Sequence, residues 1–280
     1  MISTISLRVK KKIQNTFLFL FASLSTVIAI IPLFSIIFEV VKNGIKAINL
    51  DFFILLPGPV GESVGGIANA IQGTLILVTL ASIIGIPIGV ITGIYLYEYG
   101  REKKSTLISF SVDLLYDLPS IVVGIFVYIV VVSPMHSFST IAGALALAIV
   151  MIPIIAKTTE ESLTLVPSTI SEAGIALGIP KWKNIIFIVL NSAKSGVLNG
   201  IILAVTRITG ETAPLIMTSL GSTFWFSGIN KPINSLTLLI WRYAMQPYPS
   251  AVEKAWGAAF LLLLVALALN LIVKSGGKSK

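Results

Sequence analysis

Cysteine is absent from this 280-residue sequence, and histidine occurs only once, as His136. Protein zinc sites are built mainly from cysteine and histidine, so no zinc site is expected. The absence of cysteine also excludes a small scaffold held together by disulfide bonds. A single histidine in a predicted short loop offers no Cys–His or Ser–His pair for nucleophilic catalysis. The composition therefore disfavours an enzyme.

Charge is scarce as well. Asp, Glu, Lys and Arg together make up 11% of the sequence, whereas an average soluble domain has about 25%. Apolar residues make up 55% of the sequence, and the mean hydropathy is +0.96. A chain of this composition cannot cover itself with a water-facing surface, and it is too apolar to be disordered. We therefore expect an all-α integral membrane protein.

Long apolar segments support this class. A helix that crosses the hydrocarbon core of a bilayer needs about 20 mainly apolar residues. Six segments meet this requirement: 17–41, 70–97, 107–132, 138–156, 196–219 and 255–273. The first follows a basic stretch, but its apolar run is longer than the roughly 7–15 residues of a signal peptide. The sequence predicts a single transmembrane domain over 1–280 with six transmembrane helices, of which the first is an uncleaved anchor.

The basic residues are distributed unevenly between the predicted connections. A net charge of +8 would suggest nucleic-acid binding in a soluble protein, but here Lys and Arg lie beside apolar segments, where they determine membrane orientation. One side carries most of them: Arg8, Lys10, Lys11, Lys12, Arg101, Lys103, Lys104, Lys157, Lys181, Lys183, Lys194, Lys274, Lys278 and Lys280. The other side carries Lys42, Lys46, Lys231, Arg242 and Lys254. We expect both termini in the cytoplasm, a multi-pass location in the plasma membrane, contact with lipid and no nucleic-acid partner.

Two charged residues lie inside the fifth predicted span. Arg207 and Glu211 are four residues apart, which places them on one face of a continuous helix. Each charge at the bilayer centre costs roughly 2.5–3.5 kcal/mol, whereas an exposed pair at this spacing returns only about 0.3–0.5 kcal/mol. The pair must therefore face protein or water. It is either a buried ion pair that fixes the helix or, as we favour, part of a substrate pathway.

An arginine in such a pathway indicates an anionic substrate. The guanidinium group stays protonated, and its fork of donors matches tetrahedral oxyanions. Glu211 would orient the fork and partly neutralise it, so that the ion is not trapped. Hydroxyl groups are available from neighbouring threonines: Thr206, Thr209 and Thr212. Gly210 permits local unwinding, and the candidate pathway residues are Arg207, Glu211 and Thr212.

A second charged pair, Asp113 and Asp117, lies in the third predicted span. Like charges at this spacing repel each other. We expect both near the cytoplasmic start of that span, where the helix dipole favours acidic residues. The pair is therefore interpreted mainly as interfacial, with a role in the pathway as the alternative.

Two other patterns concern packing. Gly85, Gly89 and Gly93 form a stripe of small residues that lets helix backbones approach closely. Between the last two spans, residues 236–245 are apolar but too short to cross a bilayer, so they predict a re-entrant or interfacial helix.

The connection between the fourth and fifth spans, 157–195, is the most informative polar stretch. Thr169 and Glu172 have the spacing of a capping box after a proline. Gly178 suits the residue that follows a helix end, and Pro180 suits the start of the next helix. The pattern predicts a cytoplasmic helix–turn–helix, which would serve as a docking element.

This connection resembles the cytoplasmic loop of importer-type ABC-transporter permeases, whose pattern is E-A-A, three residues, G, nine residues and I-x-L-P. Glu172, Ala173 and Gly174 stand at the E-A-A positions, Gly178 stands at the glycine, and 188–191 at the final four. The sequence departs from the pattern at Gly174 and at Asn191, which replaces the final proline. In the family this loop docks on the ATPase subunit, so the resemblance implies a role in ATPase coupling for Glu172, Ala173, Gly174 and Gly178.

Four further segments, 65–75, 117–126, 207–216 and 255–264, are similar to the permeases of phosphate importers. The R-x-x-G-E-T-A-P motif at 207–214 is the most specific of them. The resemblance implies the type I (MetI-like) permease bundle and import of inorganic phosphate. It also implies a complex with a second, related permease, a homodimer of ATPase subunits and an extracytoplasmic phosphate-binding protein.

ATP and its magnesium ion are expected on the ATPase partner, and no cofactor is expected in this chain. Gly277-Lys278-Ser279 matches only the end of a Walker A loop, because Ile272 stands where the first glycine is required. Two alternatives stay open. One is a permease for molybdate, tungstate, sulfate or phosphonate, which Arg207 alone does not distinguish from phosphate. The other is an ion-coupled secondary transporter, a class that often shows internal repeats.

Overall fold

The computed structural model describes residues 2–59, 61, 64–100 and 103–276. Within that range all regular elements are helical, and only isolated bridges join Pro57 to Gly65 and Leu220 to Ile233. The helices are α1 (Ile2–Ala47), α2 (Leu50–Ile54), α3 (Ala68–Tyr99), α4 (Lys103–Asp117), α5 (Ser120–Val127), η1 (Tyr128–Val132), α6 (Ser133–Met135), α7 (Thr140–Thr164), α8 (Ser168–Ala176), α9 (Lys181–Lys183), η2 (Asn184–Val189), α10 (Leu190–Ser192), α11 (Lys194–Thr209), α12 (Ala213–Thr218), α13 (Leu236–Ala244) and α14 (Pro249–Gly276). The all-α expectation is confirmed.

All six predicted spans fall on helices, but two of them are not straight. Four helices are long and apolar enough to cross a membrane: α1 from Gln14, α3, α7, and α14 as far as Ile272. The number rises to six if each of two bent helix pairs is counted as one span. These pairs are Ser105–Asp117 with Ser120–Met135, and Lys181–Ser192 with Lys194–Thr209. The segment predicted at 107–132 belongs to one such pair, in which α4 and α5 meet at 105°. The predictions that concern Arg101 and 277–280 lie outside the described residues.

The bend between α4 and α5 follows from Pro119. A proline disfavours helical backbone at the residue before it, so α4 ends at Asp117 and α5 begins at Ser120. Asp113 and Asp117 therefore lie toward the C-terminal end of α4, and the prediction that they lie near the start of a helix is wrong. Carboxylates at a helix C-terminus oppose the helix dipole. Lys157 of α7 compensates by forming an ion pair with Asp113.

Helix α7 is the centre of the bundle, and its closest neighbour is α3. The glycine stripe of α3 is buried against it, as predicted. A Cβ atom at Gly89 would lie 2.7 Å from the Cβ atom of Ile155, and one at Gly85 would lie 2.5 Å from Cγ of Met151. Such distances are shorter than any real contact, so only glycine lets these two backbones pack so closely.

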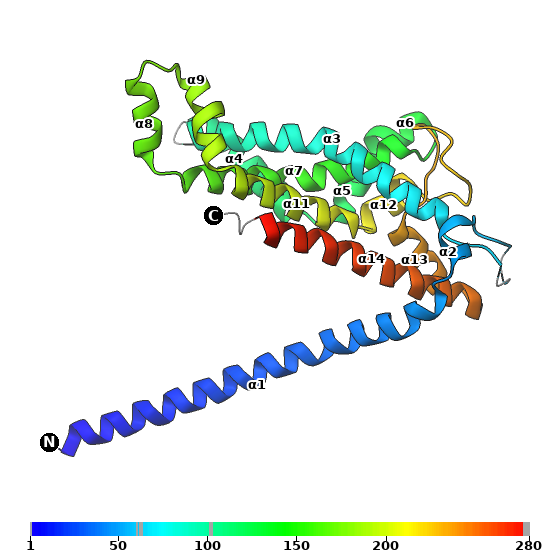
Figure 1. Cartoon of the computed structure of the whole chain (residues 1–280), viewed down its shortest axis with the longest axis horizontal. Helices are drawn as coiled ribbons and strands as arrows, with labels where there is room; N and C mark the ends of the chain where they lie inside the picture. The colour runs from blue at the N-terminus through cyan, green and yellow to red at the C-terminus, as the bar shows by residue number, and fades with distance from the viewer. Residues whose placement is uncertain (1, 60, 62–63, 101–102, 277–280) are drawn as a thin grey trace.

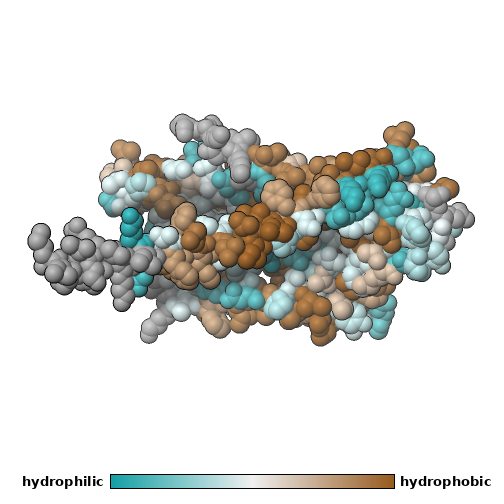
Figure 2. All heavy atoms as spheres, turned by 90° about the horizontal axis from the view of Figure 1, so that it is seen from below, coloured by the Kyte–Doolittle hydropathy of each residue, from teal (hydrophilic) through white to brown (hydrophobic). Residues whose placement is uncertain are grey.

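Helix α1 leaves the bundle and extends away from it (Figure 1). Its contacts are made near its C-terminal end, where Gly44 packs on Phe260 of α14. Along most of its length large apolar side chains are exposed, among them Phe17, Phe34 and Phe38. Figure 2 shows apolar areas across the lower face of the molecule. These exposed surfaces are suited to lipid or to a second membrane subunit.

The bundle has two distinct ends (Figure 1). One, the α8 end, carries α8, α9 and the C-terminal end of α14; the N-terminal end of α1 points the same way. The other, the α13 end, carries α2, α6, α13 and the start of α14. This arrangement matches the two sides derived from the basic residues in the described parts of the connections: the α8–α9 region and the C-terminal end of α3, joined to it by Lys181 and Glu98, lie toward the α8 end.

Candidate functional site

The fifth predicted span unwinds at the charged pair. Helix α11 ends at Thr209 and α12 begins at Ala213, so Glu211 and Thr212 lie in a break and not in one continuous helix. The amide of Gly210 donates to the carbonyl of Arg207 (3.1 Å), and that of Glu211 donates to Ile208 (3.2 Å). Local unwinding is thus confirmed, whereas the prediction of a single helical face for Arg207 and Glu211 is wrong.

Arg207 and Glu211 still form an ion pair across the break. Nε of Arg207 lies 3.6 Å from Oε1 of Glu211, which is longer than an ordinary N–H···O hydrogen bond. The Arg207 side chain is 54% exposed, whereas that of Glu211 is 16% exposed. Glu211 therefore lies on the protein side and Arg207 on the open side of the pair. The long contact through Nε leaves the two-pronged end of the guanidinium group available to another anion.

The backbone at the break is fixed by two other helices. Oγ1 of Thr237 in α13 donates to the carbonyl of Glu211 (3.0 Å). Helix α5 packs so closely on α12 that a Cβ atom at Gly124 would lie 2.7 Å from Cα of Pro214. The unwound segment is therefore held in place by its surroundings, as a preorganised site requires.

The neighbouring threonines contribute less than expected. The hydroxyl groups of Thr206 and Thr209 donate to carbonyls of their own helix, at Ile202 (2.8 Å) and Val205 (2.7 Å). Both residues line a groove against α1 and α14. They do not extend the polar surface of Arg207.

One face of α11 is left open in this chain. Leu203 and Arg207, one turn apart, are both more than half exposed, whereas Ala204 and Ile208 are buried in the core. Toward the α8 end, Leu203 also lines a cavity of about 300 Å³ that contains Asp113, Asp117 and Lys157. The open face thus presents a cation next to a charged cavity.

The predicted helix–turn–helix is present, and Gly178 forms its turn. Gly178 follows the C-cap of α8 with φ +78°, a left-handed conformation in which glycine is favoured. Its amide donates to Ile175 (2.9 Å), and that of Ile179 donates to Gly174 (3.2 Å). These two bonds are those of a Schellman motif. The predicted helix end is therefore confirmed.

The predicted capping box is wrong. Helix α8 begins at Ser168 with Pro167 as its N-cap, and no side chain caps it. Thr169 is already inside the first turn, too late in the helix to act as the cap. The predicted connection 157–195 is shorter than expected at both ends, because residues 157–164 continue α7 and Lys194 begins α11.

The residues of the E-A-A pattern divide between an exposed and a buried face. Glu172 and Ala173 are exposed, together with the large apolar side chains of Leu177 (81%) and Trp182 (58%). Lys181 holds this hairpin to the bundle through an ion pair with Glu98 at the end of α3. An exposed apolar surface on a firmly attached hairpin suits a protein-docking site.

Gly174 is buried, and the side chain of Asn184 explains why it replaces alanine. Asn184 is fully buried and donates through Nδ2 to the carbonyl (3.0 Å) and the hydroxyl (2.8 Å) of Ser171. A Cβ atom at Gly174 would clash with its Oδ1 and would lie 3.0 Å from Cδ1 of Ile188. The departure from the family pattern is therefore a packing adjustment between α8 and η2.

This packing gives a testable expectation. Gly174→Ala is expected to lower the stability of the hairpin by about 1–3 kcal/mol, because overpacking forces Asn184 out of place. The double variant Gly174→Ala/Asn184→Ala removes the clashing amide together with its two bonds to Ser171, so its loss should be smaller than the sum of the losses of the two single variants. Protease susceptibility of the hairpin in the purified protein measures both. Equal susceptibility of wild type and Gly174→Ala would contradict the packing account.

Sequence reasoning missed a cluster at the α13 end. Arg242 and Lys254 were assigned only to membrane orientation, yet both line one cavity there, beside Tyr243. The available signal was Arg242 itself, the only charged residue in the otherwise apolar α13.

Comparison with known proteins assigns the chain to a family. Residues 85–276, more than half of the chain, match the model of the binding-protein-dependent transport system inner membrane component. The chain belongs to this family. As members of an inner-membrane permease family with several apolar helices, such chains are multi-pass membrane proteins, and this part of the predicted localisation is confirmed.

Curated relatives of this permease carry a more specific name. It is 44% identical over 240 residues to the phosphate transport system permease protein PstA of Yersinia pestis, covering 85% of this chain and 81% of that protein. It is 40% identical to PstA of Haemophilus influenzae over 265 residues, covering 94% of each. It is 37% identical to the probable PstA of Methanocaldococcus jannaschii over 258 residues, covering 91% and 90%. The resemblance to phosphate-importer permeases is confirmed.

Solved structures support the permease fold. A chain of a bacterial alginate ABC transporter, crystallised with its alginate-bound periplasmic protein, aligns with a TM-score of 0.69 at 16% identity over 96% of each chain. A chain of the MetNI methionine ABC transporter aligns with a TM-score of 0.57 at 19% identity, covering 75% of this permease and 94% of that chain. The prediction of an importer-type MetI-like bundle is confirmed.

Proposed function

We propose that this chain is the permease subunit of an ATP-driven importer of inorganic phosphate and forms half of the translocation pathway. The observation that carries the proposal is the Arg207–Glu211 pair at the break between α11 and α12. It lies within the R-x-x-G-E-T-A-P segment of a chain 37–44% identical to phosphate permeases. A fixed guanidinium group matches the tetrahedral oxyanion that those relatives are named for.

In this proposal the Arg207 fork binds phosphate through charge-assisted hydrogen bonds while Glu211 holds the guanidinium group in place. Glu211 also keeps the site from binding too tightly, because its carboxylate repels the anion once phosphate is bound. Thr212, in the break itself, is the third proposed pathway residue. The anion then moves along the open face of α11 toward the α8 end.

The proposed partners follow from the surfaces left open. A second, related permease closes the face that carries Leu203 and Arg207, and it covers part of the exposed length of α1. A homodimer of ATPase subunits binds ATP and magnesium and docks on the α8–α9 hairpin at Glu172, Ala173 and Gly178. An extracytoplasmic phosphate-binding protein delivers the substrate at the α13 end, with both termini of this chain in the cytoplasm.

Substrate competition tests the choice of phosphate over the other oxyanions. Labelled phosphate uptake by the reconstituted complex is measured with excess unlabelled phosphate, sulfate, molybdate, tungstate or a phosphonate. The proposal predicts that only unlabelled phosphate abolishes uptake of the label. If one of the other anions inhibits more strongly and is itself taken up, that anion and not phosphate is the substrate.

A further inference from the structure

A cavity of about 190 Å³ lies at the α13 end, between residues 57–59 and 61, α13 and the first turns of α14. Its volume is several times the roughly 30 Å³ that one molecule of liquid water occupies, which leaves room for a small anion with part of its hydration. Arg242 and Lys254 line it, and none of the lining residues that the structure describes is an Asp or a Glu. The described lining is therefore cationic.

Both cations are held in position by backbone carbonyls. Nζ of Lys254 donates to the carbonyl of Val64 (3.0 Å), and Nη2 of Arg242 donates to that of Leu220. Each contact uses one donor, whereas a lysine has three and an arginine has five. The remaining donors are available to a ligand, and neither side chain has to be immobilised when the ligand binds.

The backbone that holds Arg242 is strained. Leu220 has φ +57° and Gly221 has φ +85°, although a side chain such as leucine rarely adopts a positive φ. A Cβ atom at Gly221 would lie 2.8 Å from Nη2 of Arg242. Strain of this kind persists only where the surrounding structure enforces it, and it concentrates at functional sites. Here it lets the turn accept the guanidinium group.

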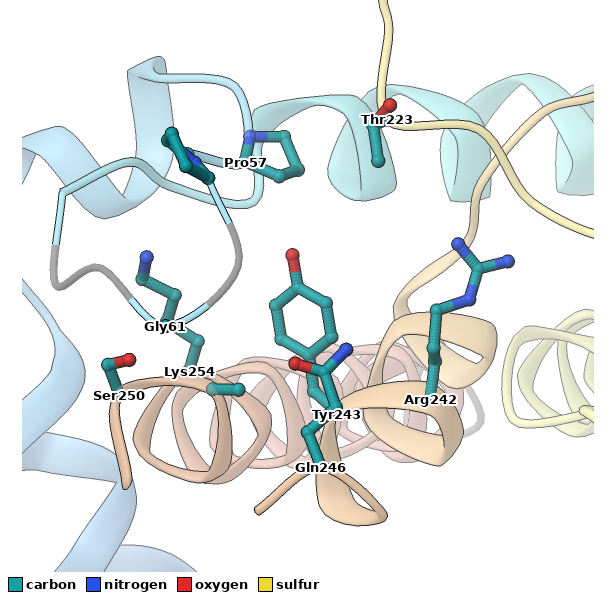
Figure 3. Close-up of a pocket in the computed structure, with 11 residues that line it drawn as sticks. Pro57, Gly61, Thr223, Arg242, Tyr243, Gln246, Ser250 and Lys254 are labelled. Atoms are coloured by element: carbon teal, nitrogen blue, oxygen red, sulfur yellow. The ribbon is translucent and has the colours of Figure 1, made fainter. Parts of the chain in front are cut away.

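Neutral hydrogen-bonding groups surround the two cations (Figure 3). The phenol of Tyr243 points into the cavity, and Thr223 and Ser250 lie at its edges. Burial raises the pKa of Tyr243, an effect that exceeds the opposing influence of Arg242. The phenol therefore remains protonated at physiological pH and can donate to an oxyanion.

Helix α13 connects this cavity to the pathway. Its first turn contacts Glu211 through Thr237, and its last turn carries Arg242 and Tyr243. Thr237 and Arg242 are five residues apart, about 7.5 Å along the helix axis at 1.5 Å per residue. Helix α13 therefore contacts the backbone at Glu211 near its start and lines the cavity near its end.

We propose that this cavity is a reception site for a phosphate-sized oxyanion, bound by Arg242 and Lys254 and hydrogen-bonded by Tyr243, before the anion reaches Arg207. The inference rests on the proposed function for the direction of transport. The chemistry of the site does not depend on that function, since two cations held in position, with no carboxylate among the described lining residues, attract any small oxyanion.

Equilibrium binding of labelled phosphate tests the site directly. The probe is the purified complex with its second permease and ATPase dimer, without ATP and without binding protein. In the Arg207→Gln background, which removes the pathway cation, Arg242→Gln/Lys254→Gln is expected to raise the Kd for phosphate at least tenfold. Lys231→Gln, an exposed lysine outside the cavity on the same side, is the matched control and should change the Kd less than twofold. Arg207→Gln alone should retain binding at the cavity although its uptake is strongly reduced.

An unchanged Kd in the double variant would overturn the inference. If the double variant fails to assemble, Lys254→Gln alone repeats the test, because its amide can still donate to Val64, and an unchanged Kd there has the same meaning. Normal phosphate binding with lost capture of the binding protein would show a docking surface and would also overturn it. If the wild-type complex transports a different oxyanion, the proposed function fails. The same binding assay with that labelled anion then tests whether the cavity is its reception site.

Discussion

Replacing Arg207 by glutamine is expected to reduce phosphate uptake by about 10- to 100-fold while the complex still assembles. A hydrogen bond to a charged group contributes about 1.5–3 kcal/mol, and each 1.4 kcal/mol corresponds to a factor of ten. The glutamine side chain keeps one donor group but lacks the charge and the fork of the arginine. Initial uptake rates in proteoliposomes, normalised to the amount of assembled complex, measure the effect.

Two further variants separate substrate binding from structure. Arg207→Lys keeps the charge but loses the planar fork, so its uptake is expected between those of Arg207→Gln and wild type. Thr206→Val, at the adjacent position that faces α1 and α14, should keep uptake within about twofold. Wild-type uptake by Arg207→Gln would exclude the pathway role. Loss of the Arg207→Gln chain from the membrane would instead support a structural ion pair.

Replacing Gly178 by valine is expected to uncouple ATP hydrolysis from uptake or to weaken association with the ATPase. The residue has φ +78°, which costs a residue with a Cβ atom about 1–2 kcal/mol. A Cβ atom there would meet nothing within 4 Å, so the penalty comes from the backbone and not from a clash. To relieve it the Schellman turn must change, and α8 then presents Glu172 and Leu177 at a different angle.

Gly178→Asn is the matched control, because asparagine tolerates the left-handed conformation. It should keep transport close to wild type, and Gly178→Val should not, although both add a side chain to the same exposed position. Transport and binding-protein-stimulated ATPase activity are measured on one reconstituted preparation. Normal values of both for Gly178→Val, with normal subunit stoichiometry, would show that this hairpin is not the coupling element.

Much of the fold could be predicted because the bilayer imposes its own length scale. Apolar segments of membrane-spanning length located α1, α3, α7 and α14, and the glycine stripe correctly predicted the close approach of α3 to α7. Hydropathy carries no information on the direction in which a helix runs, however. It could not show that α4 and α5 meet at 105°, and it therefore placed Asp113 and Asp117 at the wrong end of a helix.

The candidate site was predicted in part for similar reasons. Arg207 and Glu211 could be identified because charges are costly in a membrane, and the break between them followed from Gly210. The position of Gly178 followed from the conformational freedom of glycine, whereas the capping box failed because Pro167 starts α8 earlier than assumed. The cavity at the α13 end could not be predicted, because Thr223, Arg242 and Lys254 come from separate segments that only the tertiary fold brings together.

The proposed function requires that this chain conduct phosphate only as part of a complex driven by a separate ATPase. The most direct measurement is uptake of labelled phosphate into proteoliposomes that contain the complex, its binding protein and either ATP or a non-hydrolysable analogue. Accumulation is expected with ATP, none with the analogue, and none when the second permease or the ATPase is omitted. Phosphate accumulation by this chain alone, driven by an ion gradient without ATP, would contradict it.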